Sequence, residues 1–261
     1  MSRLAGINMR ASMRQISDKI RCLEICVEDE AGARAAVQGG AERLELCCAL
    51  DCGGLTPSFG LMRALAGTAI PVVALIRPRS GDFRYTVSEK AMIADDIKAA
   101  AACGMAGVVL GAMSGPQQLD LDFLAEMVAL THAAFAPRSP LLTLHRVVDM
   151  LEKPEDAVPL AVSLGFQRIL TSGGHSGAVE GRDTLRRMVN RASGRVAIMV
   201  GGGIRPDNVS ALVSDTGVHE IHASAREPVE VDHRLRNLGF VTSDRRVTSE
   251  KTVLALRQAL S

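Results

Sequence analysis

Two short segments near the start of the chain each combine a carboxylate with a thiol. They are residues 23–26 (LEIC) and 44–47 (LELC). Alternate residues of a β-strand face the same side, so Glu24 and Cys26 are expected on one face of a strand and Glu45 and Cys47 on the matching face of another. If the strands are parallel neighbours, the sulfurs of Cys26 and Cys47 are expected at one level. The four side chains then predict a site for one soft metal ion or one substrate.

The two glutamates also predict acid–base chemistry. Burial of a carboxylate is costly unless a partner compensates its charge, and Arg77 and His145 are natural partners near strand ends. Two glutamates in unequal surroundings can divide the roles of proton donor and acceptor, and histidine titrates near neutral pH. We therefore predict Glu24, Glu45, Arg77 and His145 as catalytic residues. The alternative is an ion-pair network with a purely structural role.

Glycine-rich segments in the second half of the chain predict an anion site. Glycine permits close approach of the backbone to a ligand. Pro206 suits the first turn of a following helix, whose N-terminal amides can bind an anion. The predicted phosphate or carboxylate site consists of Ser172, Gly173, Gly201, Gly202, Gly203 and Ser224. The alternative is that these glycines only form tight turns.

The elements that must position these residues alternate along the chain. Eight strand-like runs are separated by segments with helical spacing, of which 89–103 is the clearest. Thr86 and Glu89 predict a capping box for that helix, and Gly104 its end. The predicted strands are 21–26, 42–47, 71–77, 106–111, 141–145, 167–172, 195–200 and 218–223.

This rhythm of strand, helix and glycine predicts a fold of the α/β class, a single-domain (β/α)8 TIM-type barrel over residues 21–261. Glycines end several of the helices just before the next strand, which is typical of βα units in parallel sheets. An open parallel sheet is the alternative. In such barrels the functional residues lie at the carboxyl ends of the strands, and the candidate residues above all lie at predicted strand ends.

Three stretches lie outside the repeating units. Residues 1–20 are predicted to be an N-terminal extension, residues 227–248 a long loop after the eighth strand, and residues 250–260 a final helix that completes the outer ring. Each prediction rests on the polar or periodic character of the stretch.

Composition narrows the partners. The 261 residues carry a formal net charge of only +1, which does not favour a nucleic-acid partner. No apolar stretch has the length of a membrane span, and the first residues lack the apolar core of a signal peptide. Six cysteines in a chain of this length indicate free thiols rather than a disulfide framework. We therefore expect a cytoplasmic protein.

Several motifs, in order, give the chain a family resemblance. They are LEICVEDEAGARAAVQGGAERLELC, GGLTPSFGL, IRPRSGDFRY, HRVVDM, RILTSGG and MVGGGIRPDNV. Over residues 22–226 the chain resembles the CutC copper-homeostasis family. The resemblance implies a TIM-type barrel in the cytoplasm, often a homo-oligomer, with a role in copper handling. It also implies Cu(I) ligation by two cysteines, which match Cys26 and Cys47.

The chain departs from the usual family pattern at three places. HRVVDM stands where HRAFDM is common, MVGGG where MPGGG is common, and the segment after Arg226 differs. These departures concern pocket shape and substrate. Three functions therefore stay open: Cu(I) binding, with Cys48, Cys52 or His145 as a third ligand; a barrel enzyme for a small anionic substrate; and a scaffold that affects copper indirectly.

Overall fold

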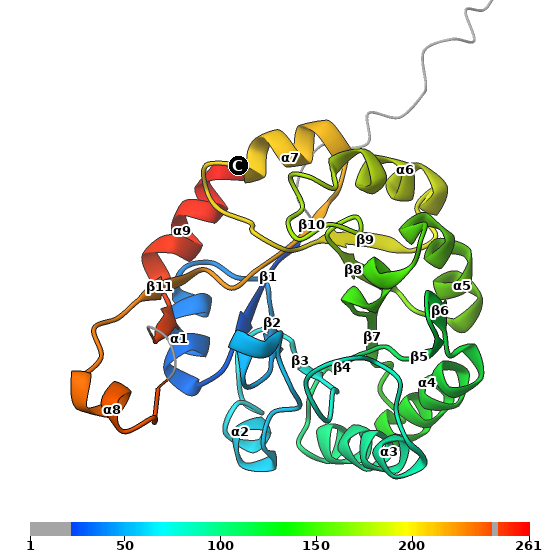
Figure 1. Ribbon diagram of the computed structural model, residues 1–261, viewed down its shortest axis with the longest axis horizontal. Coiled ribbons are helices and arrows are strands. Elements are labelled where there is room, and N and C mark those ends of the chain that lie inside the picture. Colours follow the sequence, from blue (N-terminus) through cyan, green and yellow to red (C-terminus); the bar gives the residue numbers. More distant parts are fainter. Residues whose placement is uncertain (1–21, 242–244) are drawn as a thin grey trace, which may run out of the picture.

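Eight parallel strands close into a barrel in the computed structural model, which describes residues 22–241 and 245–261 (Figure 1). Around the barrel the strand order is β1, β10, β9, β8, β7, β4, β3, β2, so each strand pairs with its neighbours in the chain and the last pairs with the first. The strands are β1 (Cys22–Val27), β2 (Arg43–Leu46), β3 (Val72–Leu75), β4 (Gly107–Leu110), β7 (Leu141–Leu144), β8 (Arg168–Thr171), β9 (Ala197–Val200) and β10 (Glu220–Ala223).

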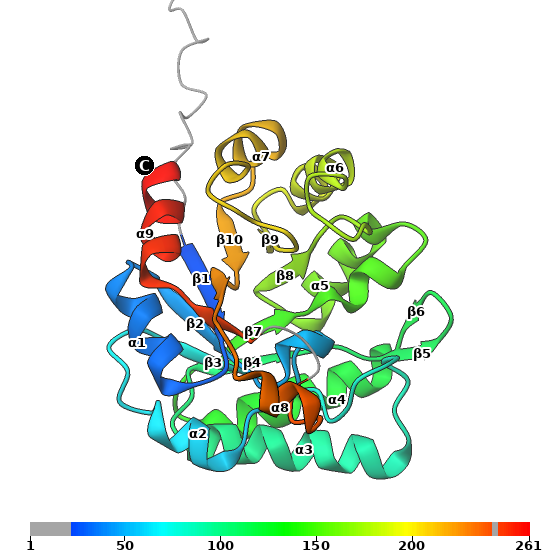
Figure 2. The same cartoon turned by 60° about the vertical axis from the view of Figure 1, so that its left-hand side comes forward.

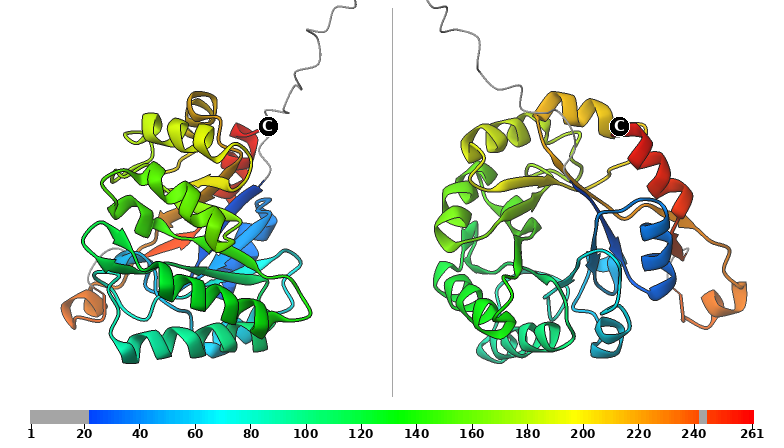
Figure 3. Two further views of the ribbon diagram at one scale, coloured as in Figure 1. Left: turned by 90° about the vertical axis from the view of Figure 1, so that its right-hand side faces the viewer. Right: turned by 180° about the vertical axis from the view of Figure 1, so that it is seen from behind.

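A ring of helices surrounds the barrel, one after each strand. The last of them, α9, packs against both α1 and α7 and so closes the ring (Figure 3). The helices of the ring are α1 (Glu30–Gln38), α2 (Phe59–Ala64), α3 (Val87–Ala102), α4 (Leu121–Phe135), α5 (Ala157–Leu164), α6 (Arg182–Ala192), α7 (Val209–Thr216) and α9 (Glu250–Ala259). None of the helices in the described ranges is long and apolar enough to cross a membrane.

The predicted TIM-type barrel is thus confirmed, and all eight predicted strands are present within a few residues of their expected ends. The capping box of α3 is also confirmed, since the Thr86 side chain accepts from the Glu89 amide and the Glu89 side chain accepts from the Thr86 amide. Gly165 and Gly217 end α5 and α7 in the left-handed conformation that glycine adopts most readily.

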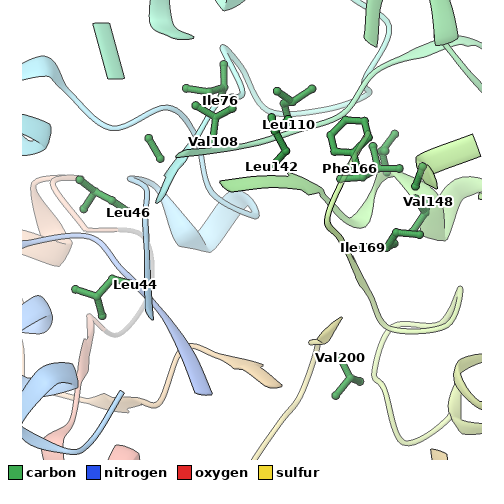
Figure 4. Packing of buried hydrophobic residues seen from close by; sticks show 14 of the residues in the cluster. Leu44, Leu46, Ile76, Val108, Leu110, Leu142, Val148, Phe166, Ile169 and Val200 are labelled. Carbon is green, nitrogen blue, oxygen red and sulfur yellow. The ribbon is translucent and has the colours of Figure 1, made fainter. Parts of the chain in front are cut away.

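The alternation of side chains along each strand separates two environments. Outward residues such as Leu44, Val108 and Ile169 pack between the sheet and the helices and form most of the apolar core (Figure 4). Inward residues form a smaller apolar cluster of Cys26, Cys47, Val73, Leu75 and Val109. The remaining inward positions include charged side chains, so the interior of the barrel is partly polar.

The segment predicted as a long loop has more structure than expected, and the prediction for 227–248 was wrong in this respect. Strands β11 (Arg226–Pro228) and β12 (Arg246–Thr248) pair in antiparallel fashion, and the short helix α8 (His233–Asn237) lies between them. The pairing escapes sequence analysis because its partners are short, polar and about 20 residues apart. This segment extends beside the barrel next to α1 (Figure 2).

A second small hairpin, β5 (Met113–Gly115) with β6 (Gln118–Leu119), precedes α4 and was not expected either. The predicted N-terminal extension, residues 1–20, lies outside the described residues.

Candidate functional site

The strand register offsets the segments 23–26 and 44–47 relative to each other by two residues. Cys26 pairs with Glu45, and Glu24 pairs with Arg43. The expectation that the sulfurs of Cys26 and Cys47 share one level is therefore wrong, because Cys47 lies two residues beyond Glu45, just after the end of β2. The cause is the stagger between neighbouring strands that a closed barrel requires.

Three inward side chains from different strands meet at the position of Cys26. One ligand atom each from Cys26, Glu45 and His222 lies within 4.8 Å of the other two. Nε2 of His222 is 3.6 Å from the Glu45 carboxylate, and its Nδ1 is 2.7 Å from the Glu24 carboxylate. The imidazole therefore bridges both glutamates, and the cluster offers sulfur, nitrogen and oxygen to a metal ion or a substrate.

An ion-pair network lies beneath this cluster. Arg43 binds the carboxylate of Glu24 and, at 2.7 Å, the carboxylate of Glu220. Arg168 binds the same Glu220 at 3.1 Å. All four side chains are buried or nearly so, and Glu24 is completely inaccessible. This arrangement realises the alternative of a structural ion-pair network for Glu24, with Arg43 rather than Arg77 as its partner.

The two glutamates have opposite electrostatic surroundings. Burial alone would raise the pKa of Glu24, but Arg43 and His222 outweigh it and lower that pKa to about 2. Burial raises the pKa of Glu45 to about 7, and the Glu24 charge adds to this effect while His222 opposes it. Burial would lower the pKa of His222, yet Cys26, Glu45 and Glu24 together hold it well above its ordinary value. Glu24 is thus a fixed anion, whereas Glu45 can exchange a proton near neutral pH.

A cavity of about 410 Å³ opens above the cluster at the carboxyl ends of the strands. Cys26, Glu45 and His222 line it, whereas Glu24 does not. Its other lining residues come mainly from the loops after β2, β3, β7, β9 and β10, and they are Leu50, Gly53, Leu75, Arg77, Phe83, His145, Arg146, Leu170, Gly202, Gly203, Ile204, Ala223, Ser224 and Arg226. Its position agrees with the rule that TIM-type barrels bind ligands at this end.

Cys47 lies outside the cavity lining. Its side chain is fully buried, contributes to the small interior apolar cluster and lies 3.6 Å from the Val27 carbonyl oxygen. Burial raises the pKa of the Cys47 thiol strongly. The thiolate that a metal requires is therefore harder to form at Cys47 in this conformation.

Arg77 and His145 lie on the cavity wall, and within the described residues neither forms a hydrogen bond or ion pair with Glu24 or Glu45. Arg77 donates to the carbonyl oxygens of Cys52, Gly54 and Gly81 at 3.0–3.1 Å. Burial and the nearby Arg77 charge lower the pKa of His145 to about 3. The expected role of His145 as a group that titrates near neutrality is therefore not supported.

One residue of the predicted anion site, Ser172, already binds an anion of the protein itself. The Asp149 carboxylate accepts from the amides of Ser172 and Gly174 at 3.0–3.2 Å and from the hydroxyls of Thr171 and Ser172. The Gly173 amide donates to Thr171, and the Gly201 amide donates to the Thr171 carbonyl oxygen. Ser172, Gly173 and Gly201 thus have internal partners and do not line the cavity.

The other half of the predicted anion site faces the cavity. Gly202, Gly203 and Ser224 line it, and the amides of these three residues donate no hydrogen bond in the described part of the chain. The Arg146 guanidinium lies beside them, with Nη1 3.5 Å from the position that a Cβ at Gly202 would take. Asp149, Ser172 and the His175 carbonyl oxygen hold this guanidinium in place.

Several residues that shape the site are not among the predicted site residues, namely Arg43, Glu220, Arg168, Arg146, Asp149 and His222. A signal exists for part of this set. Charged residues at alternate positions of otherwise apolar strands, as at 43 and 45 or at 220 and 222, indicate a polar barrel interior. No local pattern shows that Asp149 reaches the loop after β8.

Comparisons with known proteins agree with this architecture. The model of the CutC family matches residues 21–227. A CutC family protein of Agrobacterium fabrum is 46% identical over 241 residues, covering 92% of this chain and 94% of its own, and one of Rhizobium meliloti is 45% identical over 240 residues, covering 91% and 95%. The crystal structure named Putative Copper Homeostasis Protein CutC, from Streptococcus agalactiae, superposes with a TM-score of 0.70 at 29% identity and covers 78% of this chain and 98% of its own. The chain therefore belongs to the CutC family.

Proposed function

We propose that this protein takes part in copper homeostasis by binding one Cu(I) ion at the bottom of the barrel-mouth cavity, with Cys26 as the first ligand. The carrying observation is the meeting of Cys26, Glu45 and His222 within 4.8 Å beside an accessible cavity. Thiolate is a preferred ligand of Cu(I), and imidazole is an acceptable one. The copper-homeostasis name of the solved relative supports the same assignment.

Two groups compete for the second ligand position. His222 lines the cavity together with Cys26 and belongs to the same cluster. Cys47, the second sulfur predicted from the sequence, packs near Cys26 but lies outside the lining. Accessibility favours His222, whereas the softness of sulfur favours Cys47. Glu45 is a hard ligand and is assigned the role of a charged neighbour.

Competition for Cu(I) between the reduced protein and a coloured Cu(I) chelator, without oxygen, tests the proposal. The unmodified protein is expected to take up one Cu(I) per chain. Cys26→Ser is expected to weaken binding by more than about 100-fold, beyond the loss typical of a residue that only orients a ligand. The same loss in His222→Gln or in Cys47→Ser identifies the second ligand.

Cys103→Ser is the matched control, because Cys103 is a buried thiol in the outer core and lies outside the cavity lining. It should bind Cu(I) as the unmodified protein does. Stoichiometric uptake of undiminished affinity by Cys26→Ser would contradict the proposal.

A second candidate function is acid–base catalysis on a small anionic substrate. The observation that favours it is Glu45, a carboxylate with a pKa of about 7 that lines the cavity opposite cationic and glycine-rich loops. Such a pKa is suited to a general base or acid at physiological pH. His145 and Arg77 would contact the substrate in this function, and Glu24 would act through His222 as a positioning residue.

Solvent deuterium exchange tests this second function. The protein is incubated in D2O with a panel of small phosphorylated and carboxylated keto compounds, and loss of carbon-bound hydrogen is followed by NMR. We expect exchange in at least one compound, and a reduction of about 100-fold or more in Glu45→Gln. Absence of exchange throughout the panel, or an equal rate in Glu45→Gln, would count against acid–base catalysis.

The proposal includes a cytoplasmic location and a homo-oligomeric assembly. All six cysteines are free, including a buried pair in one apolar cluster, which supports a reducing compartment. The homo-oligomer rests on the family resemblance alone.

A further inference from the structure

Arg77 is a buried cation whose charge no carboxylate compensates in the described part of the chain. The residue is only 6% exposed, and in the described residues its side chain donates to three backbone carbonyl oxygens. Its Nε is buried and has no hydrogen-bond partner. A buried charge without a counter-ion is costly, yet this one lines the cavity.

His145, which lines the same cavity, carries a second buried donor without a partner. Its Nδ1 accepts a hydrogen bond from the Val147 amide at 3.1 Å, so the proton of the neutral ring is on Nε2. That Nε2 atom is buried and has no hydrogen-bond partner, and the residue as a whole is only 5% exposed. With a pKa of about 3, His145 remains an uncharged donor throughout the physiological range.

Packing fixes both donors on one wall. The Phe83 ring lies between them, 4.9 Å from the Arg77 guanidinium carbon and 5.0 Å from the His145 ring. Gly111 leaves room for the imidazole, since a Cβ there would come within 2.6 Å of it. The donors are therefore arranged before any ligand arrives, which lowers the entropic cost of binding.

Further donors face the cavity from another direction. Arg146 lies next to His145 in the chain, and its Nη1 makes no hydrogen bond within the described ranges. The unpaired amides of Gly202 and Gly203 lie across from β3, at the end of β9. Donors that follow β3, β7 and β9 thus line one cavity from different sides of the barrel, an arrangement better suited to a group with oxygens in three dimensions than to a planar carboxylate.

We propose that the missing counter-ion of Arg77 is a ligand, namely the phosphate group of a small phosphorylated molecule, held by Arg77, the neutral His145 Nε2–H group, Arg146 and the Gly202–Gly203 backbone. This inference rests on the second of the two proposed functions, for which it names the substrate class. It is independent of copper. The cavity of about 410 Å³ lies in the range of small-molecule sites, so space remains for the carbon skeleton beside Glu45.

Sulfate is a suitable probe, because it has the shape of a phosphate group and does not titrate near neutral pH. The full-length protein is titrated with sulfate while the Arg77 Nε–H and His145 Nε2–H signals are followed by proton–nitrogen NMR. Saturable shifts of both signals are expected. Formate, a planar anion, is the comparison probe and should bind more weakly.

Two variants of His145 separate the hydrogen bond from the fold. His145→Phe removes the donor and should weaken sulfate binding by roughly 10- to 100-fold, the effect of one hydrogen bond to a charged group. His145→Gln supplies another neutral donor and should recover part of the loss. His132→Phe, on the exposed surface of α4, is the matched control and should change nothing.

Sulfate that shifts neither signal, tighter binding of formate, or an equal loss in His132→Phe would each overturn the proposed phosphate site. The Arg77 signal of the unmodified protein keeps the test valid even if His145→Phe does not fold.

Saturable sulfate binding at this wall with no deuterium exchange in the panel would contradict acid–base catalysis and still support the phosphate site. Exchange without these shifts would remove the site alone.

Discussion

Replacement of Arg43 by leucine is expected to lower the free energy of unfolding by about 3–5 kcal/mol, because loss of one partner leaves buried charges uncompensated. Arg43 is the cation that joins Glu24 to Glu220 inside the barrel. Arg168 would still neutralise Glu220, but in the described residues His222 would be the remaining partner of Glu24. Urea unfolding at pH 7 measures the effect.

Arg34→Leu is the matched control for this experiment. Arg34 forms an exposed ion pair with Glu30 on α1, with both side chains about three-fifths accessible. Such pairs contribute about 0.3–0.5 kcal/mol. A loss of less than about 1 kcal/mol in Arg43→Leu would show that the network does not depend on this cation. A double variant with Glu24→Gln should recover part of the lost stability, because the uncompensated charge is removed.

Replacement of Asp149 by alanine is expected to cost about 3–4 kcal/mol, since hydrogen bonds to a charged group contribute about 1.5–3 kcal/mol each and are not additive. The carboxylate accepts from the amides of Ser172 and Gly174, from the Thr171 hydroxyl and from Arg146. Without it, these donors remain around a small space. Added formate should restore part of the stability by occupying that space, and thermal unfolding with and without formate measures the rescue.

The control for Asp149 is Asp183→Ala, which removes an exposed carboxylate paired with Arg186 on α6. It should change stability by less than about 1 kcal/mol and should show no formate effect. Equal responses to formate in both variants would contradict the view that Asp149 fills an anion-binding cradle.

The barrel could be predicted because its determinants are local. Apolar alternation marks the strands, and glycines such as Gly165 and Gly217 mark the helix ends. The offset of Cys47 from Cys26 could not be predicted, because strand stagger is a property of the closed sheet and not of either segment. Cys26 and Glu45, both predicted as site residues, line the cavity, but the sequence analysis placed Cys47 rather than Glu45 opposite Cys26.

The remaining differences arise from contacts between distant residues. His222 contacts Glu24 and Glu45, which lie 198 and 177 positions away in the chain. The available sequence clue is that His222 lies two residues after Glu220, so both side chains are on the same face of β10. Asp149 occupies the Ser172 amide, which the sequence analysis assigned to an anionic ligand, because the η2 turn (Arg146–Met150) directs its carboxylate toward the loop after β8. Functional residues at strand ends can therefore be predicted from the sequence more readily than the contacts between them.

The buried layer of Glu24, Arg43, Glu220 and Arg168 affects how a ligand can reach and leave Cys26. Paired side chains fill the interior below Cys26, and the cavity that Cys26 lines opens at the rim where the strands end. A copper ion and a phosphorylated ligand would then share one entrance to the cavity. The copper ion at Cys26 would lie deeper, so its release is expected to be slower while the phosphorylated ligand occupies the outer part of the cavity.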